Sequence, residues 1–289
     1  MHIFSSTANI IDAAVVSFFL SARFFLLASA IFMFLYVWKR KKYWYAKIQQ
    51  RYPENKYIFH EIKYSFFTVI IFGLVISEIV WASKAKLTLI YYPIDKYGYP
   101  YYFLSIILMI VVHDAYFYWT HRFLHWKPVF KMVHKVHHRS INPTPFSSYC
   151  FHPVEALIEV GIFPLIVFTI PYHVSALAVF AVYTLVLNVV GHTGYEIFPK
   201  GFATHKIWKW HNTPTHHNMH HKFTKCNYGL YFNFWDRVMK TNHAKYEEYY
   251  ESVIKQRRAG KTDNVKKPFA PTVRETTKAE PSLAATDTN

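Results

Sequence analysis

Five apolar runs, separated by short polar or aromatic segments, dominate the first two thirds of the chain. They cover residues 10–38, 64–82, 102–119, 154–170 and 172–190. A helix needs about 20 mainly apolar residues to cross a bilayer, so most of these runs are long enough to form a span. The pattern predicts an all-α integral membrane protein with about four transmembrane helices.

The first and last runs each carry an interruption. Asp12 and Arg23 lie inside the first run, so it is either one tilted span or an interfacial piece followed by a short span. The last two runs meet at Pro171, which favours a turn. They predict a tight helical hairpin or re-entrant pair that returns His192 to the side from which the pair began.

The basic run at residues 39–42 fixes the predicted orientation, because lysine and arginine gather in cytoplasmic loops. When membrane crossings are counted from this basic run, the loop at residues 89–101 falls on the non-cytoplasmic side. The polar segments 120–152 and 191–250 then both fall on the cytosolic side. These two segments are rich in histidine, so we expect a cytosolic helical cap with the histidines inside it.

We divide the chain into three parts. Residues 1–63 form an N-terminal membrane anchor with a basic cytosolic loop, and no cleavable signal peptide is expected. Residues 64–251 carry the remaining spans and the cap. Residues 252–289, rich in Lys, Thr, Pro and Ala, predict a disordered tail.

Composition supports the membrane interpretation. Hydrophobic residues make up 52% of the chain and charged residues only 17%, against about a quarter in a soluble domain. The net charge of +16 comes from Lys and Arg that flank apolar runs, which indicates contact with anionic lipid and no nucleic-acid partner. Cys150 and Cys226 form no CxxC pair, which argues against a disulfide framework or a thiolate zinc site.

Fifteen of the 18 histidines lie between His113 and His221. They form an HxxxH pair, two HxxHH groups and a single histidine after the hairpin. At helical spacing, each group keeps its rings on one side of a helix. The candidate ligands are His121, His125, His134, His137, His138, His192, His217, His220 and His221. Imidazole suits Zn, Cu, Fe and Ni, but one zinc ion takes about four ligands, so nine histidines indicate two metal ions.

Several neighbouring residues are candidates for further ligands or for partners of the ligands. His113 could reach the site or orient a ligand, whereas His216 points about 100° away from His217 on a helix and is the weaker ligand of the two. Asp114, Glu155 and Glu196 could accept a hydrogen bond from the second ring nitrogen of a ligating histidine.

These motifs resemble the fatty acid hydroxylase/sterol desaturase superfamily. Residues 113–125 (HDAYFYWTHRFLH) are similar to its first histidine box and residues 134–138 (HKVHH) to its second. Residues 188–196 (NVVGHTGYE) are similar to its third element. Residues 217–221 (HNMHH), 227–229 (NYG) and 235–237 (WDR) are similar to its closing block. The resemblance covers roughly residues 104–241 and makes 64–251 the catalytic domain.

The resemblance implies an O2-dependent di-iron oxidoreductase that hydroxylates or desaturates a membrane lipid. The nine histidines above would hold two Fe ions, for which zinc can substitute in purified protein, and no catalytic residue is expected beyond the metal centre. Electrons would come from a separate donor such as cytochrome b5 or a ferredoxin. The expected location is the endoplasmic reticulum of a eukaryote or the inner membrane of a bacterium, with a cytosolic active site.

The subfamily is indicated by one departure from the pattern of the superfamily and by two segments. Some hydroxylases of the superfamily have a histidine four residues before the single one, and here that residue is Asn188. Residues 142–148 (NPTPFSS) and 151–155 (FHPVE) resemble sterol C-5 desaturases. A fatty acyl, sphingolipid or carotenoid hydroxylase is the alternative inside the superfamily. The sequence assigns neither substrate-binding residues nor an oligomeric state.

Two functions of other classes also use histidine-bound metal. A histidine-rich metal transporter would place its site at mid-membrane, whereas these clusters lie beyond the apolar runs. A membrane zinc hydrolase would need fewer ligands and an open coordination position.

Overall fold

The computed structural model describes residues 7–263 and is mostly helical, as predicted. Four helices are long and apolar enough to cross a membrane among the described residues. In chain order the elements of the membrane part are α1 (Thr7–Phe32), the π-helix η1 (Met33–Trp38), the 3-10 turn η2 (Trp44–Ala46), α2 (Asn55–Lys84), β1 (Ile90–Tyr91), η3 (Ile94–Lys96), α3 (Gly98–Leu124), α6 (Pro153–Val160), α7 (Ile162–Thr169), β2 (Tyr172–His173) and α8 (Val174–Gly191).

The first apolar run forms a single continuous span, which decides between the two predicted alternatives. α1 passes into η1 without a break and ends at Trp38, directly before the basic run. Arg23 lies inside this helix, where its side chain stands beside the hydroxyl of Tyr149. Because Arg23 has a polar partner inside the protein, the helix can continue through the membrane at this residue.

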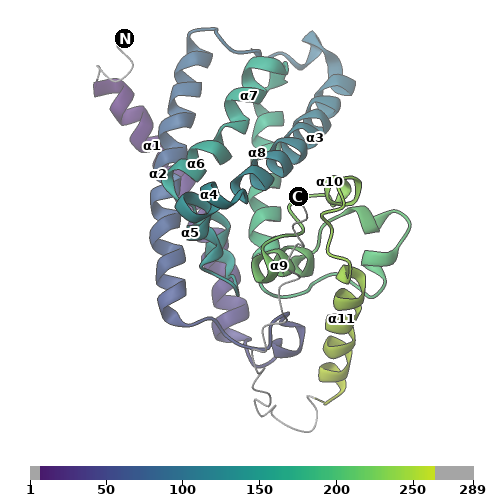
Figure 1. Cartoon of the computed structure of the whole chain (residues 1–289). Coiled ribbons are helices and arrows are strands. Elements are labelled where there is room, and N and C mark those ends of the chain that lie inside the picture. Colours follow the sequence, from purple (N-terminus) through teal and green to yellow (C-terminus); the bar gives the residue numbers. More distant parts are fainter. Residues whose placement is uncertain (1–6, 264–289) are drawn as a thin grey trace, which may run out of the picture.

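The predicted hairpin is also present, although its first arm is bent. Two short helices, α6 and α7, meet at Gly161 and lead into β2, which pairs in parallel with β1. α8 then runs back beside α3 and ends at Gly191, so that His192 follows at its C-terminal end (Figure 1). A side chain at Gly161 would displace Tyr116 of α3, since an added Cβ would lie 2.6 Å from its hydroxyl.

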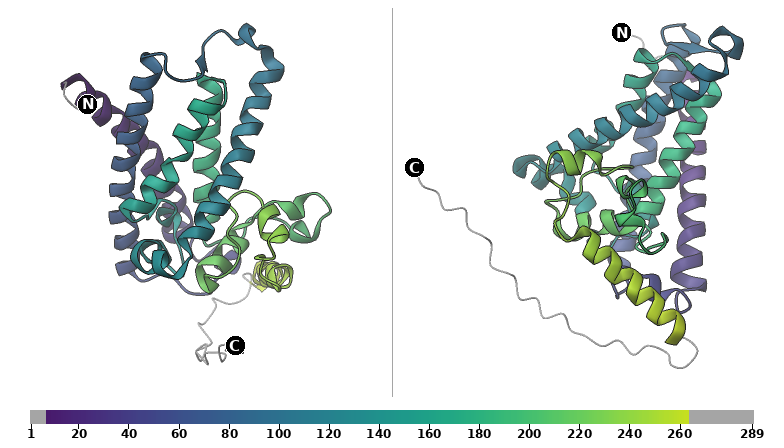
Figure 2. Two further views of the ribbon diagram at one scale, coloured as in Figure 1. Left: turned by 45° about the horizontal axis from the view of Figure 1, so that its top comes forward. Right: turned by 90° about the vertical axis from the view of Figure 1, so that its right-hand side faces the viewer.

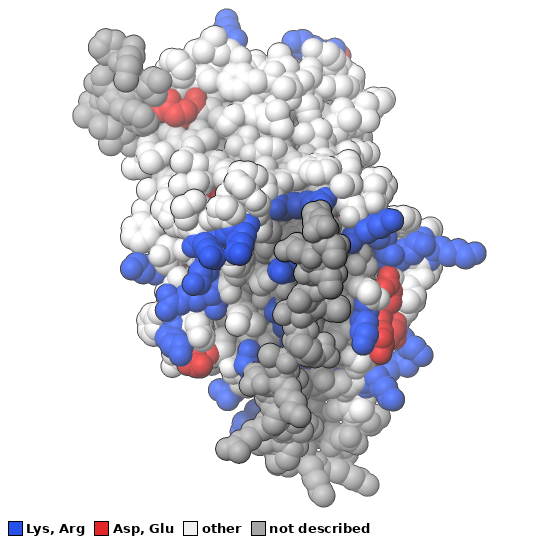
Figure 3. All heavy atoms as spheres, in the orientation of Figure 1, with Lys and Arg blue, Asp and Glu red and all other residues white. Residues whose placement is uncertain are grey.

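The cap consists of short elements gathered at one end of the long helices, as Figures 1 and 2 show. Its elements are α4 (Lys127–Val129), the π-helix η4 (Phe130–His134), α5 (Lys135–His138), the 3-10 turns η5 (Pro145–Tyr149), η6 (Phe202–Thr204) and η7 (Trp208–Trp210), and the helices α9 (Pro214–Phe223), α10 (Phe234–Val238) and α11 (Tyr246–Asp263). Lys and Arg gather over this end, whereas the opposite half of the surface carries few charges (Figure 3).

The prediction of a disordered tail from Ser252 is wrong for residues 252–263, which continue α11. Tyr246, Tyr250 and Ile254 recur every fourth residue and are buried against Ala203 and Met219. This apolar stripe stabilises the helix against the cap. Residues 264–289 lie outside the described residues.

A close contact between two helices lies where α1 crosses α2. At Gly73 an added Cβ would fall 1.7 Å from Oγ of Ser17 and 2.7 Å from its Cα. Only glycine therefore permits this crossing, in which small residues let two membrane helices approach.

We predict that Gly73→Val separates α1 from α2 and destabilises the protein by about 1–3 kcal/mol, the usual range for overpacking. The measurement is the thermal unfolding midpoint in detergent. The matched control is Leu74→Val, since Leu74 is 41% exposed on the same helix. Equal midpoints for the two variants would show that the crossing tolerates a side chain.

Candidate metal centre

Four parts of the chain bring the nine predicted ligands together. α3 carries His121 in its last turn and has His125 as its C-cap residue. η4 and α5 supply His134, His137 and His138. His192 caps α8. α9 contributes His217, His220 and His221. All are buried except His125, which is partly exposed.

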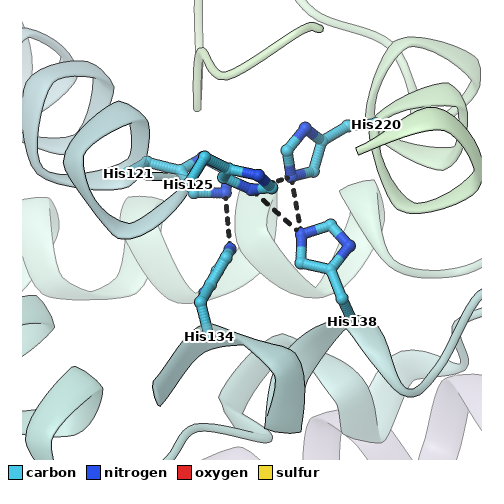
Figure 4. A group of neighbouring side chains, drawn as sticks. All are labelled: His121, His125, His134, His138 and His220. Atoms are coloured by element: carbon cyan, nitrogen blue, oxygen red, sulfur yellow. Dashed lines mark hydrogen bonds between the residues drawn. The ribbon is translucent and has the colours of Figure 1, made fainter. Parts of the chain in front are cut away.

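Five of these histidines form the first group. Their ligand atoms all lie within 4.8 Å of one another, and Figure 4 shows the rings converging from α3, the η4–α5 segment and α9. The Nε2 atoms of His121 and His134 are 3.1 Å apart, and those of His138 and His220 are 3.0 Å apart. The five members are His121, His125, His134, His138 and His220.

The other four histidines form a second group with the same compactness. They are His137, His192, His217 and His221. The Nε2 atom of His217 lies 2.8 Å from that of His192 and 3.1 Å from that of His221. The two groups are neighbours, because α5 and α9 each contribute to both of them.

Hydrogen bonds at Nδ1 determine which ring nitrogen faces each group. The Nδ1 atoms of His121, His192 and His220 lie 2.9, 2.7 and 2.6 Å from the backbone oxygens of Tyr228, Asn188 and Cys226. A carbonyl oxygen only accepts, so each Nδ1 must carry the proton and each Nε2 is a bare lone pair. Lone pairs about 3 Å apart repel unless a cation lies between them, and the residues therefore fit a metal ion.

The number of donors also bears on the type of ion. The first group offers five histidines, one more than a four-coordinate zinc ion takes, and the second group offers four.

The model of the fatty acid hydroxylase family matches residues 106–241, which include all nine histidines. This match, together with the relatives below, supports the fatty acid hydroxylase/sterol desaturase superfamily. No solved structure matches the chain.

The curated relatives include sterol desaturases. A Delta(7)-sterol 5(6)-desaturase of Gibberella zeae is 31% identical over 74% of this chain and 64% of its own length. Another, from Aspergillus fumigatus, is 30% identical over 52% of this chain and 51% of its own. Human lathosterol oxidase is 35% identical over 46% of this chain and 43% of its own. The chain thus spans less than two thirds of the length of these relatives.

Burial keeps these histidines in the form that binds metal. Burial, together with the neighbouring His121 and His221, lowers the pKa of His125 to about 2, and burial lowers the pKa of His192 to about 4. Burial likewise lowers the pKa of His217 and His220 well below the usual value. The imidazoles are therefore neutral at pH 7, as ligation requires.

One of the three carboxylates predicted as partners contacts a histidine directly. Glu155 Oε1 lies 2.7 Å from Nδ1 of His134. Glu196 instead accepts from the backbone N–H and the hydroxyl of Thr215, at the first turn of α9. Asp114 accepts from the backbone N–H groups of Tyr231 and Phe232. These two carboxylates hold the segments that carry or orient the ligands.

His113 and His216 belong to neither group. Nδ1 of His113 lies 2.9 Å from the hydroxyl of Tyr231. His216 turns away from His217, as its position on the helix predicts, and its Nε2 lies 3.2 Å from Oδ1 of Asn242. Both rings brace the cap around the site.

Sequence reasoning missed Asp236, which is fully buried. Its carboxylate accepts from the backbone N–H groups of Tyr228 and Gly229 and from the hydroxyl of Thr241. The loop held in this way presents the Tyr228 oxygen to His121. The WDR motif was a signal for this residue, but two of its three partners are backbone N–H groups, which no side-chain pattern reveals.

We predict that Glu155→Leu lowers metal affinity about 10- to 100-fold, because His134 loses the acceptor that fixes its ring. Glu155→Gln, which can still accept, should have a smaller effect. Metal affinity is measured by competition with a chelator of known affinity. The control is Glu159→Leu, one helical turn along α6; equal loss in both variants would contradict a specific role for Glu155.

Proposed function

We propose that this protein is an O2-dependent oxidoreductase that holds two iron ions in its two histidine groups. It hydroxylates or desaturates a membrane lipid, and sterol C-5 desaturation is the favoured reaction. This proposal rests mainly on the two neighbouring groups of five and four histidines, all buried except the partly exposed His125, whose ligand atoms converge in each group. A metal transporter or a one-zinc hydrolase has no use for two such groups in contact.

The chain's own residues would bind, orient and dehydrate this centre. Iron, when bound, supplies the activation of O2 and the oxidation of an unactivated C–H bond. The carbonyl oxygens behind His121, His192 and His220 hold the rings in place, so the ligand geometry exists before metal arrives. Burial of the ligands excludes bulk water, which would otherwise compete with the lipid for the oxidant.

Electron balance explains the need for a redox partner. Desaturation takes two hydrogen atoms from the lipid, while reduction of O2 to two water molecules takes four electrons and four protons. Two electrons and two protons must therefore come from outside the lipid, and the same number accompanies hydroxylation with release of one water. We propose cytochrome b5 or a ferredoxin as donor. The exposed basic residues 39–42, at the end of η1, would suit an acidic partner.

Two observations favour a sterol over an acyl chain as substrate. The relatives above are named as sterol desaturases and lathosterol oxidase. Asn188, which replaces the additional histidine of some hydroxylases, donates from its side chain to the oxygen of Ser148 and joins neither histidine group.

We further propose that the protein is a multi-pass protein of the endoplasmic reticulum in a eukaryote or of the inner membrane in a bacterium. The histidine groups would face the cytosol, because they lie at the end of the long helices that carries the basic run. Residues 64–251 would form the catalytic domain.

We predict two iron ions per chain in protein purified without oxygen, and the loss of one of them in His137→Ala, whose ring belongs to the four-histidine group. Elemental analysis of metal per chain gives the result. His173→Ala is the control, since this histidine lies in β2, at the opposite end of α8 from His192. One zinc per chain, or no change in His137→Ala, would contradict the proposed centre.

We predict that His137→Ala abolishes lipid oxidation in a host that lacks its own sterol C-5 desaturase. Lipid mass spectrometry of cells with the wild-type chain should show a sterol two mass units lighter than its precursor, whereas His137→Ala cells should accumulate the precursor. A lipid heavier by one oxygen would assign hydroxylation instead. Identical lipids in wild-type, variant and empty host would overturn the proposal.

A further inference from the structure

An exposed apolar tip projects from the cap between η6 and η7. In this segment, which we call the 202–210 lobe, Ile207 is 70%, Trp208 55% and Trp210 40% exposed. Lys206 and Lys209 lie among them in the sequence KIWKW. Large apolar side chains exposed together on a polar cap indicate a contact surface, and tryptophan with lysine is the combination found at membrane interfaces.

The lobe holds this arrangement by its own hydrogen bonds. Nδ1 of His205 accepts from the backbone N–H groups of Ile207 and Trp208, which closes the turn and directs the tip outward. The ring of Trp208 stacks on Phe202 at 6.0 Å and 16°. At the other end Asn233 donates to the backbone oxygen of Lys209 at 2.8 Å. The exposed side chains are thus presented by a folded structure.

The lobe is continuous with the lipid-facing surface of a membrane helix. Trp119, 45% exposed on α3, contacts Trp235 of α10 with ring centroids 5.7 Å apart. The adjacent Phe234, 47% exposed, contacts Trp210 at 6.3 Å. A band of exposed aromatic residues therefore leads from the span to the lobe.

The charges around the band identify its partner. Figure 3 shows few Lys or Arg residues over most of the upper half of the molecule, and many from the level at which the cap begins. Exposed Lys200 and Lys206 and half-exposed Lys209 lie in or beside the lobe. A protein partner would need an apolar face bordered by acidic residues. An anionic bilayer offers both an apolar interior and negative headgroups, and the membrane-spanning helices already place its surface near the lobe.

A hollow beside the lobe leads toward the second histidine group. Its lining includes Phe198 and His211 from the two sides of the lobe, Leu187 and Leu230, and the candidate ligands His192 and His217. The lobe therefore stands next to a lined depression that reaches the four-histidine group.

We propose that the 202–210 lobe seats in the headgroup region of an anionic bilayer and places this hollow, about 30 Å³ in volume, at the lipid surface, where it widens to let a lipid reach the four-histidine group. The statement about lipid access rests on the proposed function. The seating of the lobe does not.

The seating is tested with Ile207→Cys carrying a nitrobenzoxadiazole label, in nanodiscs that contain lipid spin-labelled near the glycerol backbone. Cys150 and Cys226 are buried, and the unsubstituted chain gives the background labelling. Glu248→Cys, on the exposed side of α11, is the matched control. We expect quenching several times stronger at 207 than at 248. Equal quenching at both positions would overturn the seating. A label at position 207 that is shielded from water but not quenched by the spin-labelled lipid would also overturn it and would indicate a contact with protein.

The charge contribution is tested by repeating the measurement in phosphatidylcholine alone and with added phosphatidylserine. Phosphatidylserine should increase quenching at 207, and Lys206→Glu with Lys209→Glu should abolish the increase. Equal quenching in the two lipids would overturn the role of the lysines.

Lipid access is tested with Ile207→Ser combined with Trp208→Ser. We expect the metal content and kcat to stay unchanged and KM for nanodisc-embedded lipid to rise severalfold. An unchanged KM would overturn lipid access at this hollow. If wild-type protein oxidises no lipid while 207 is still quenched, the proposed function fails and the seating stands.

Discussion

The hydrogen bonds at Nδ1 of the histidines are the constraint on which the rest of the centre depends. An imidazole can offer either nitrogen to a metal, and a free side chain would sample several orientations. Backbone oxygens of Tyr228, Asn188 and Cys226 and the carboxylate of Glu155 remove that choice for four rings, since each accepts the Nδ1 proton. Three of these four acceptors are backbone atoms, so the fold of the loops itself selects the ring nitrogen that faces the metal position.

Because the loops hold the rings in place, many buried polar residues that are not candidate ligands serve to hold these loops. Asp236 and Asp114 bind backbone N–H groups on either side of the loop that carries the Tyr228 oxygen. The segment after the anchor contributes as well. The backbone of Ala46 accepts from Glu196 N, and Ile48 N donates to Gly194 O. Gln49 donates to Asn218 of α9. Residues 46–49 thus pack against both histidine-bearing halves of the cap, although the sequence pattern assigned them only to a basic loop.

The long apolar helices and the set of histidines that converge could be predicted because both follow from local periodicity. Long apolar runs have one stable location in a bilayer, and HxxHH spacing places rings on one side of a helix. The division into two groups could not be predicted in this way. His137 and His138 are adjacent in the sequence yet enter different groups, because neighbouring rings diverge by about 100° and their partners come from α3, α8 and α9. α11 was missed for a related reason: its stripe of Tyr246, Tyr250 and Ile254 is short, and only the cap surface that it covers distinguishes it from a polar tail.

The segment that most resembles sterol C-5 desaturases illustrates how far a motif can be interpreted. Asn142 accepts from the buried Lys47, and Thr144 donates to the buried Glu61 of α2. The oxygen of Pro143 accepts from Tyr36 at the end of the first span. The contacts of Pro143 and Thr144 fasten the cap to the first two membrane helices, the contact of Asn142 joins it to the loop between them, and none of the three reaches a histidine group. Residues 142–144 thus mount the cap on the membrane part, whereas Glu155, in the other similar segment, contacts His134 directly.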